Sequence, residues 1–143
     1  MDGQVAPGVG LGLPARGPGS VASWSARIVA LVIDWVVSLA VSLAFAPRAQ
    51  VTSGDARWLP LVVLVVQTGA LTATSGGSFG QLLMGIRVRR VDGAPLVGLG
   101  RALLRSALIA LVVPAVVFDS DRRGLHDRAA GTVVVRRVNG RRR

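Results

Sequence analysis

The sequence predicts an α-helical integral membrane protein with a transmembrane helical hairpin, a third short re-entrant or membrane-embedded helical segment, and a small cytoplasmic two-stranded β element. Three observations support this fold class. The chain is 51% hydrophobic over 143 residues, with a mean hydropathy of +0.55, which is too apolar for an ordinary soluble domain. Two long apolar runs are joined by a short link, and two β-branched runs flank a third apolar segment.

The charged residues of the chain are lopsided. All 17 basic residues are Arg and all 7 acidic residues are Asp, which gives a net charge of +10. The Arg residues cluster beside apolar runs, where they suit anionic lipid headgroups at the cytoplasmic face of a membrane. We therefore expect a lipid bilayer as the partner and no nucleic acid, because no stacking aromatics accompany the Arg residues. The absence of Cys excludes disulfides and thiolate chemistry.

The first apolar run predicts a helix over residues 27–46. Nineteen residues follow Arg27 in this run, and as a helix they extend about 28 Å, enough to cross the hydrocarbon core. The preceding Gly- and Pro-rich residues 1–22 are expected to be a disordered tail. Ala44-Phe-Ala46 resembles the small-x-small pattern of a signal-peptide cleavage site, but the length of the run, Asp34 within it and the 26 residues before it argue against cleavage.

A second apolar run predicts a helix over residues 58–74. Its short link to the first run favours an antiparallel hairpin, in which Ser38, Ser42 and Gly69 supply small surfaces for helix packing. The membrane domain is expected to extend over residues 23–137.

The third apolar segment, expected to be helical over residues 99–118, decides the topology. A full crossing would place the strands predicted at 86–91 and 131–137 on opposite sides of the membrane and would divide the Arg residues between them. A segment that dips in and returns, with Pro114 as its apex, keeps nearly all Arg on one side, as the positive-inside rule favours. We therefore expect a multi-pass protein of the cell membrane with paired strands, both termini in the cytoplasm, and a basic tail at 138–143.

An acidic residue, Asp34, lies in the middle of the first apolar run. A carboxylate inside the membrane costs about 2.5 to 3.5 kcal/mol, so it must face protein or water. Arg27 lies nearly on the same helix face but about 10.5 Å along the axis, too far for direct pairing. Arg101 and Arg105 share a helix face, and one of them is the expected counter-charge. Asp34 is then either a proton or cation site or part of an Asp–Arg clasp that sets helix register.

The only histidine, His126, precedes Asp127 near the C-terminus. A single His with no Cys or Glu is a poor metal-ligand set, so we expect neither a metal nor a cofactor. No nucleophile elbow or phosphate-binding glycine loop is present, so we expect no enzyme activity. Asp127 is expected to accept hydrogen bonds from backbone amides or from Arg122 or Arg123, and thereby to hold a helix end against the second strand.

In their order along the chain, these features resemble the RDD family of membrane proteins, over about residues 22–137. The matching features are Arg27, Asp34, the bend Ser75-Gly-Gly-Ser-Phe-Gly80, Gly85-Ile-Arg-Val88, the Asp92-Gly93 turn, Arg101 to Arg105, and Arg-Gly-Leu-His-Asp127 running into Ala-Gly-Thr-Val-Val-Val135.

The resemblance implies that Arg27, Asp34 and Asp127 are the Arg and the two Asp for which the family is named. It also implies a protein whose role is broadly unknown, with ligand transport suggested and sodium–proton exchange reported for some relatives. Gln81 departs from the Lys that relatives often carry, and the third apolar segment is short. A short third segment leaves fewer walls for a pathway, so a transporter of this size would need to oligomerise.

Two functions follow as hypotheses. The first is transport of an ion or small solute through an intramembrane Asp–Arg site, with Asp34 at its centre and Arg27 or Arg105 as its partner. The alternative is a non-transporting accessory or assembly subunit of a larger membrane complex. The expected protein partner is therefore a second copy of the chain or a larger complex.

Overall fold

The computed structural model describes residues 6–111 and 123–138. They form a mostly helical structure with one long apolar helix, a shorter apolar helix and a two-stranded antiparallel sheet. The elements, in chain order, are η1 (Val9–Leu11), α1 (Trp24–Phe45), α2 (Arg48–Ser53), α3 (Leu59–Ser75), α4 (Phe79–Leu83), β1 (Ile86–Arg90), α5 (Leu99–Ala110), α7 (Leu125–Ala130) and β2 (Thr132–Arg136). The expected pair of apolar helices and the expected small sheet are confirmed.

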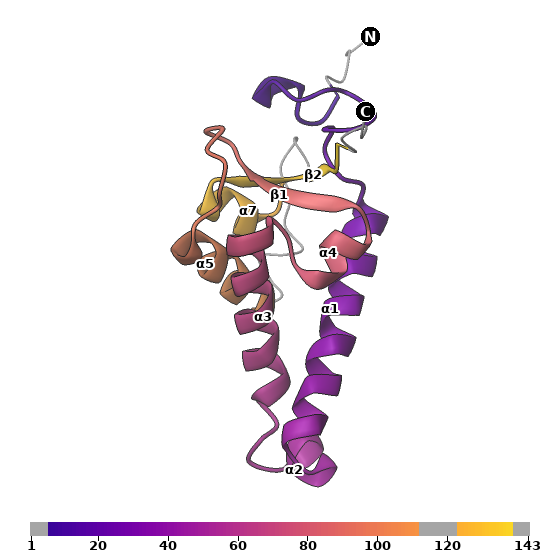
Figure 1. Cartoon of the computed structure of the whole chain (residues 1–143), viewed down its shortest axis with the longest axis vertical. Coiled ribbons are helices and arrows are strands. Elements are labelled where there is room, and N and C mark those ends of the chain that lie inside the picture. Colours follow the sequence, from indigo (N-terminus) through magenta and orange to yellow (C-terminus); the bar gives the residue numbers. More distant parts are fainter. Residues whose placement is uncertain (1–5, 112–122, 139–143) are drawn as a thin grey trace.

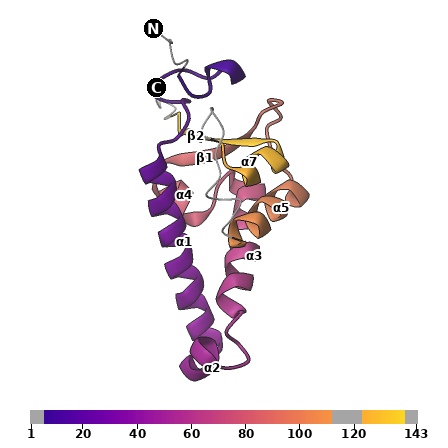
Figure 2. The ribbon, with the colours of Figure 1, turned by 180° about the vertical axis from the view of Figure 1, so that it is seen from behind.

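The two apolar helices extend from one end of the molecule to the other. Both views place the sheet, α4, α5 and α7 at one end of the pair formed by α1 and α3, and α2 at the opposite end (Figures 1 and 2). Helix α1 is long and apolar enough to cross a membrane, whereas α3 is shorter. The short elements at the sheet end therefore form a head on a helical hairpin.

Helix α1 presents one narrow face to the rest of the molecule. Its N-cap is Ser23, whose hydroxyl accepts a hydrogen bond from the backbone nitrogen of Ala26 at 3.4 Å. The buried positions recur every four residues, so they form a single row along the helix. These positions are Ala30, Asp34, Ser38 and Ser42. The row carries mostly polar groups, while the large apolar side chains of α1 are largely exposed.

Helix α3 has clear sequence signals at both ends. Pro60 lies in its first turn, where its missing N–H costs nothing. The helix ends at Gly76, which adopts a left-handed conformation with φ of 73° that suits glycine. Gly69 in its middle lets α5 approach closely, since a Cβ there would lie 2.6 Å from Cδ2 of Leu103. Gly69 therefore provides a small packing surface, but toward α5 and not within the α1–α3 hairpin as expected.

The sheet forms the core of the head. Strands β1 and β2 pair antiparallel, with Val88 opposite Val134. One face of this pair packs into a small apolar cluster beneath the sheet. The cluster contains Ala22, Ala30, Ile86, Val88, Val97, Ala102 and Val134.

The segment before α1 departs from the expected disordered tail. Residues 19–22 run alongside β2 and extend its hydrogen bonding. The backbone nitrogen of Arg136 donates to the carbonyl of Ser20 at 2.8 Å, and that of Ala22 donates to the carbonyl of Val134 at 2.9 Å. Composition did not reveal this, because backbone pairing to a sheet edge depends little on side-chain type.

The third apolar segment begins as expected at Leu99 but is described only as far as residue 111. Helix α5 packs against α3 and α7 through its buried face, which includes Ala102, Arg105 and Ser106. The expected helix over 99–118 and its apex at Pro114 extend into residues that lie outside the described ones. The re-entrant turn therefore stays a prediction.

Candidate functional site

The carboxylate of Asp34 binds the bend that follows α3. Its side chain is buried, and Ser78 donates a hydroxyl hydrogen bond to Oδ2 at 2.5 Å. The backbone nitrogen of Gly80 donates to Oδ1 at 2.8 Å. Each carboxylate oxygen thus has a protein donor, and the middle of α1 is tied to the start of α4.

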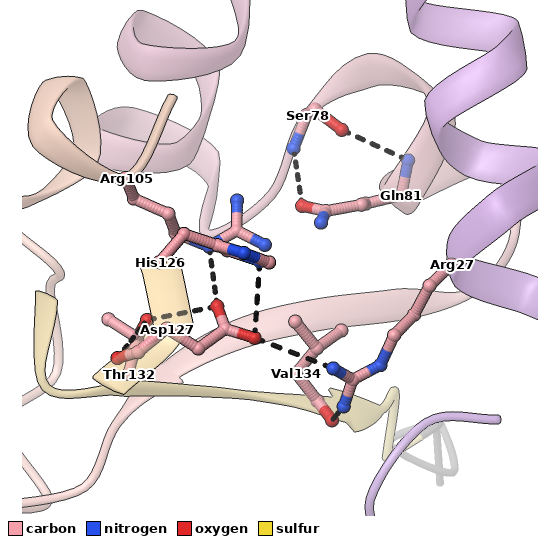
Figure 3. Close-up of polar contacts among 8 residues, drawn as sticks. All are labelled: Arg27, Ser78, Gln81, Arg105, His126, Asp127, Thr132 and Val134. Carbon is pink, nitrogen blue, oxygen red and sulfur yellow. Dashed lines mark hydrogen bonds and ion pairs between the residues drawn. The ribbon is translucent and has the colours of Figure 1, made fainter. Parts of the chain in front are cut away.

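Helix α4 is built to meet this carboxylate. Ser78 is its N-cap and forms a capping box with Gln81, whose Oε1 accepts from the backbone nitrogen of Ser78 at 3.0 Å (Figure 3). Gly80 faces the backbone of α1 directly, because an added Cβ would lie 2.0 Å from the carbonyl oxygen of Ala30. The absence of a side chain at Gly80 lets its N–H reach Asp34.

Polar contacts continue along α1 toward α3. The amide nitrogen of Gln67 donates to the carbonyl of Asp34 at 3.0 Å and to the hydroxyl of Ser38 at 2.8 Å. The hydroxyls of Ser38 and Ser42 each donate a hydrogen bond to the backbone carbonyl four residues earlier, at 2.7 Å. The buried row of α1 is therefore hydrogen-bonded.

A second buried carboxylate, Asp127, lies in the head on α7. The Nε of Arg105 donates to its Oδ1 at 2.8 Å, and the Nη1 of Arg27 lies 3.4 Å from its Oδ2. The hydroxyl of Thr132 adds a hydrogen bond to Oδ1 at 3.3 Å. Figure 3 shows the two Arg side chains reaching Asp127 from opposite sides, one from α5 and one from α1.

Arg27 connects this carboxylate to the sheet as well. Its Nη2 donates to the backbone carbonyl of Val134 in β2 at 3.3 Å. Through one guanidinium, the first turns of α1 are therefore fixed to both α7 and β2. The pair formed by Arg27 and Asp127 joins residues 100 positions apart, so it closes the fold between the two ends of the domain.

No direct ion pair forms between Asp34 and the expected partners Arg101 and Arg105 among the described residues, so the expected contact is wrong, although the charge of Arg105 still acts on Asp34 from a distance. Its donors are Ser78 and Gly80, whereas Arg105 pairs with Asp127 and Arg27 reaches the same carboxylate. Arg101 is exposed and donates to the carbonyl of Ala130 at 3.2 Å. The physical reason is the packing of α5, which turns the face bearing its Arg residues toward α7.

Asp127 does hold a helix end against the second strand, and it does so through donors that the sequence did not indicate. Arg105, Arg27 and Thr132 contact its carboxylate. Arg122 lies outside the described residues, and the expected role of Arg123 at this carboxylate stays a prediction.

His126 lies beside the same carboxylate. Its Nε2 is 3.5 Å from Oδ2 of Asp127, and the ring is buried. Gly124 makes room for it, since a Cβ there would lie 2.4 Å from Cε1 of the ring. Across residues 6–111 and 123–138, no three His, Cys, Asp or Glu side chains gather as a metal would require.

Sequence reasoning missed four site residues: Ser78, Gly80 and Gln67 around Asp34, and Thr132 at Asp127. By residue type, the Gly- and Ser-rich stretch from Ser75 to Gly80 indicates only a bend that ends the preceding helix. Its Ser78-x-x-Gln81 spacing is a capping-box signature and could have predicted the short helix α4. No sequence signal placed that helix against Asp34.

The fold and its polar sites define a class of protein: an apolar helical hairpin with a small sheet at one end and two buried carboxylates that hold the elements together. The chain belongs to the RDD family, whose model matches residues 21–131. No curated protein and no solved structure matches the chain.

The ionisation of Asp127 should make stability depend on acidity. Burial by itself would raise the pKa of this carboxyl, but the positive charges around it, that of Arg105 first, hold the pKa below its ordinary value of 3.8. A carboxyl whose pKa is lowered on folding stabilises the folded state above the ordinary pKa, and this contribution is lost as the pH falls through the folded-state pKa.

We therefore expect the stability difference between the wild type and Asp127→Asn to shrink on acidification. The measurement is the free energy of unfolding of both proteins in detergent, from neutral pH down to about pH 3. Asp92→Asn is the control, because Asp92 is exposed, pairs with Arg90 and accepts a hydrogen bond from the backbone nitrogen of Ala94. Folding lowers the pKa of Asp92 as well, but its ion pair is at the surface, so its difference from the wild type should be smaller at every pH. A difference that stays constant with pH would contradict the assignment.

Proposed function

We propose that this protein is an integral membrane protein of RDD type, with α1 and α3 crossing the bilayer as a hairpin. Helix α1 has 22 residues and α3 has 17, about 33 Å and 26 Å long, close to the thickness of a hydrocarbon core. In the most apolar stretch of 18 residues in α1, only 22% of the residues are buried inside the protein. A soluble core helix would be covered, so the outward apolar side chains support contact with lipid.

The charge distribution supports a cytoplasmic position for the head. The link between α1 and α3 carries only two Arg, whereas the head carries most of the described Arg residues. By the positive-inside rule, this distribution supports a cytoplasmic position for the sheet and for both chain ends.

Within this placement, we propose a non-transporting accessory or assembly subunit of a larger membrane complex. The observation that carries the proposal is the Asp34 site, where both carboxylate oxygens are held by donors of the protein itself. Asp127 is likewise held between Arg27 and Arg105. Carboxylates fixed in this way suit a rigid module, and the exposed apolar faces of the hairpin offer surface for a partner.

One observation favours transport as a second candidate. The buried row of α1 places Ser38 and Ser42 below Asp34, and Gln67 of α3 faces the same row. Such a polar row inside a membrane hairpin could form one wall of a pathway. Two helices cannot enclose a pathway, so this function requires several copies of the chain.

Asp34→Asn in purified, reconstituted protein tests the two candidates. As an accessory subunit, the wild type should produce no proton or cation flux in liposomes and should co-purify with a larger complex in mild detergent. Asp34→Asn should weaken that complex and lower the free energy of unfolding by about 1 to 3 kcal/mol. The amide has one oxygen that accepts and one nitrogen that only donates, so it cannot accept both the hydroxyl of Ser78 and the N–H of Gly80 on separate atoms.

Asp55→Asn is the matched control, since it makes the same chemical change in the exposed link. Cation-dependent flux by the wild type that Asp34→Asn abolishes, without a loss of stability, would overturn the accessory role in favour of transport.

A further inference from the structure

A basic pocket lies in the head at the end of α3. It has a volume of about 490 Å³ and is lined by the last residues of α3, by β1, by the loop after β1 and by the end of β2. Four of its lining residues are Arg: Arg87, Arg89, Arg136 and Arg137. The cluster arises from the sheet. Arg87 and Arg89 are two residues apart in β1, so they lie on the same face of that strand. Antiparallel pairing brings the end of β2, with Arg136 opposite Ile86, beside the start of β1.

The positive charge of this pocket is not balanced within the described part of the chain. No Asp lines it. Asp34 and Asp127 are buried in their own sites, Asp92 pairs with Arg90, and Asp55 belongs to the link at the opposite end. The four pocket Arg residues are exposed and form no ion pair across residues 6–111 and 123–138. An anion would therefore be attracted here.

Apolar surface adjoins the Arg cluster. Leu96 and Val138 line the same pocket and are 60% and 62% exposed. The pocket also includes Thr74 and Ser75 at the end of α3, an apolar helix of the hairpin. A ligand with an anionic group attached to an apolar body would contact both the Arg cluster and the apolar surface. Lipids have this form, and their headgroups lie at the ends of membrane-spanning helices.

We propose that this pocket binds the phosphate of an anionic phospholipid headgroup, with Leu96 and Val138 contacting the adjoining glycerol and acyl region. The inference rests on the membrane placement of the proposed function, but it holds for an accessory subunit and for a transporter alike. Guanidinium groups bind phosphate oxygens through paired hydrogen bonds, so four of them favour a phosphate over a weakly hydrated anion.

The test is lipid retention by the full chain in phosphatidylcholine bilayers with and without phosphatidylglycerol. The protein is extracted in mild detergent and the retained lipids are identified by native mass spectrometry. The pocket variant is Arg87→Gln with Arg89→Gln. The matched control is Arg16→Gln with Arg90→Gln, which removes the same charge from residues that do not line the pocket but belong to segments at the same end of the molecule (Figure 1).

The wild type should retain phosphatidylglycerol in preference to phosphatidylcholine. The pocket variant should weaken this preference by at least about tenfold, since each basic residue near anionic lipid contributes about a fivefold change. The control variant should keep the preference. Equal losses in both variants, or no preference in the wild type, would overturn the proposal. Displacement of the lipid by millimolar inorganic phosphate or by an oligonucleotide would assign the pocket to a soluble ligand and overturn it as well.

Insertion is measured separately, by flotation with pure phosphatidylcholine vesicles. Failure to insert there contradicts the membrane placement. Insertion without any preference for phosphatidylglycerol contradicts the pocket inference alone.

Discussion

Replacing Asp127 with alanine should lower the free energy of unfolding by about 3 to 5 kcal/mol, the cost of leaving a buried ion pair without one partner. Arg105 is only 2% exposed at its side chain, so water cannot replace the lost carboxylate. Arg27 would lose the same partner, and its tie between α1 and α7 would be gone. We expect loosening of the whole head, because α1, α5, α7 and β2 all meet at this carboxylate.

Chemical denaturation in detergent measures this effect. Asp92→Ala is the control, since it removes an exposed Asp–Arg pair that should contribute less than about 1 kcal/mol. A second variant, Asp127→Ala with Arg105→Met, should recover part of the loss, because it removes the buried unpaired charge. If Asp127→Ala is no more destabilising than Asp92→Ala, the central role of this carboxylate is refuted.

Replacing Gly80 with alanine should cost about 3 kcal/mol, at the upper end of typical overpacking effects. The added Cβ would lie 2.0 Å from the carbonyl oxygen of Ala30 and 2.8 Å from its carbonyl carbon. Both contacts are with backbone, which cannot rotate away as a side chain can. Helix α4 must then move away from α1, and the hydrogen bond from the nitrogen of Gly80 to Asp34 must lengthen.

Gly100→Ala is the matched control for this prediction. Gly100 lies in α5, has no positive φ, and has nothing within 4 Å of the position that an added Cβ would take. Alanine also favours helix more than glycine does, so the stability of this variant should be unchanged or slightly raised. Unfolding measurements on both variants decide the matter, and a Gly80→Ala protein as stable as Gly100→Ala would show that α4 does not sit against α1 as described.

The two predicted losses concern different attachments of the same helix. Gly80 and Ser78 fix the middle of α1 to the bend, whereas Asp127 fixes its first turns, through Arg27, to the head. These groups of residues do not share a hydrogen bond among the described contacts. We therefore regard the family's Arg and two Asp as two separate sites, one between α1 and α4 around Asp34 and one where α1, α5, α7 and β2 meet at Asp127.

The sequence by itself determined the apolar helices and the positions of the two strands. The long run after Arg27 and the run after Trp58 each carry enough consecutive apolar residues to form a helix that exposes apolar side chains. The alternation of Arg and Val in β1 likewise predicts a strand with one buried face. These features depend on local periodicity, which is present in the residues themselves.

Only the tertiary structure decided the partners of the charged groups. Local spacing correctly excluded a direct pair between Arg27 and Asp34, but it could not show that Arg27 reaches Asp127, 100 residues away. Nor could it show that a serine hydroxyl and a glycine N–H would hold Asp34. Periodicity fixes which face of an element a residue occupies, whereas the identity of its partner depends on how separate elements pack, and that arises from the chain as a whole.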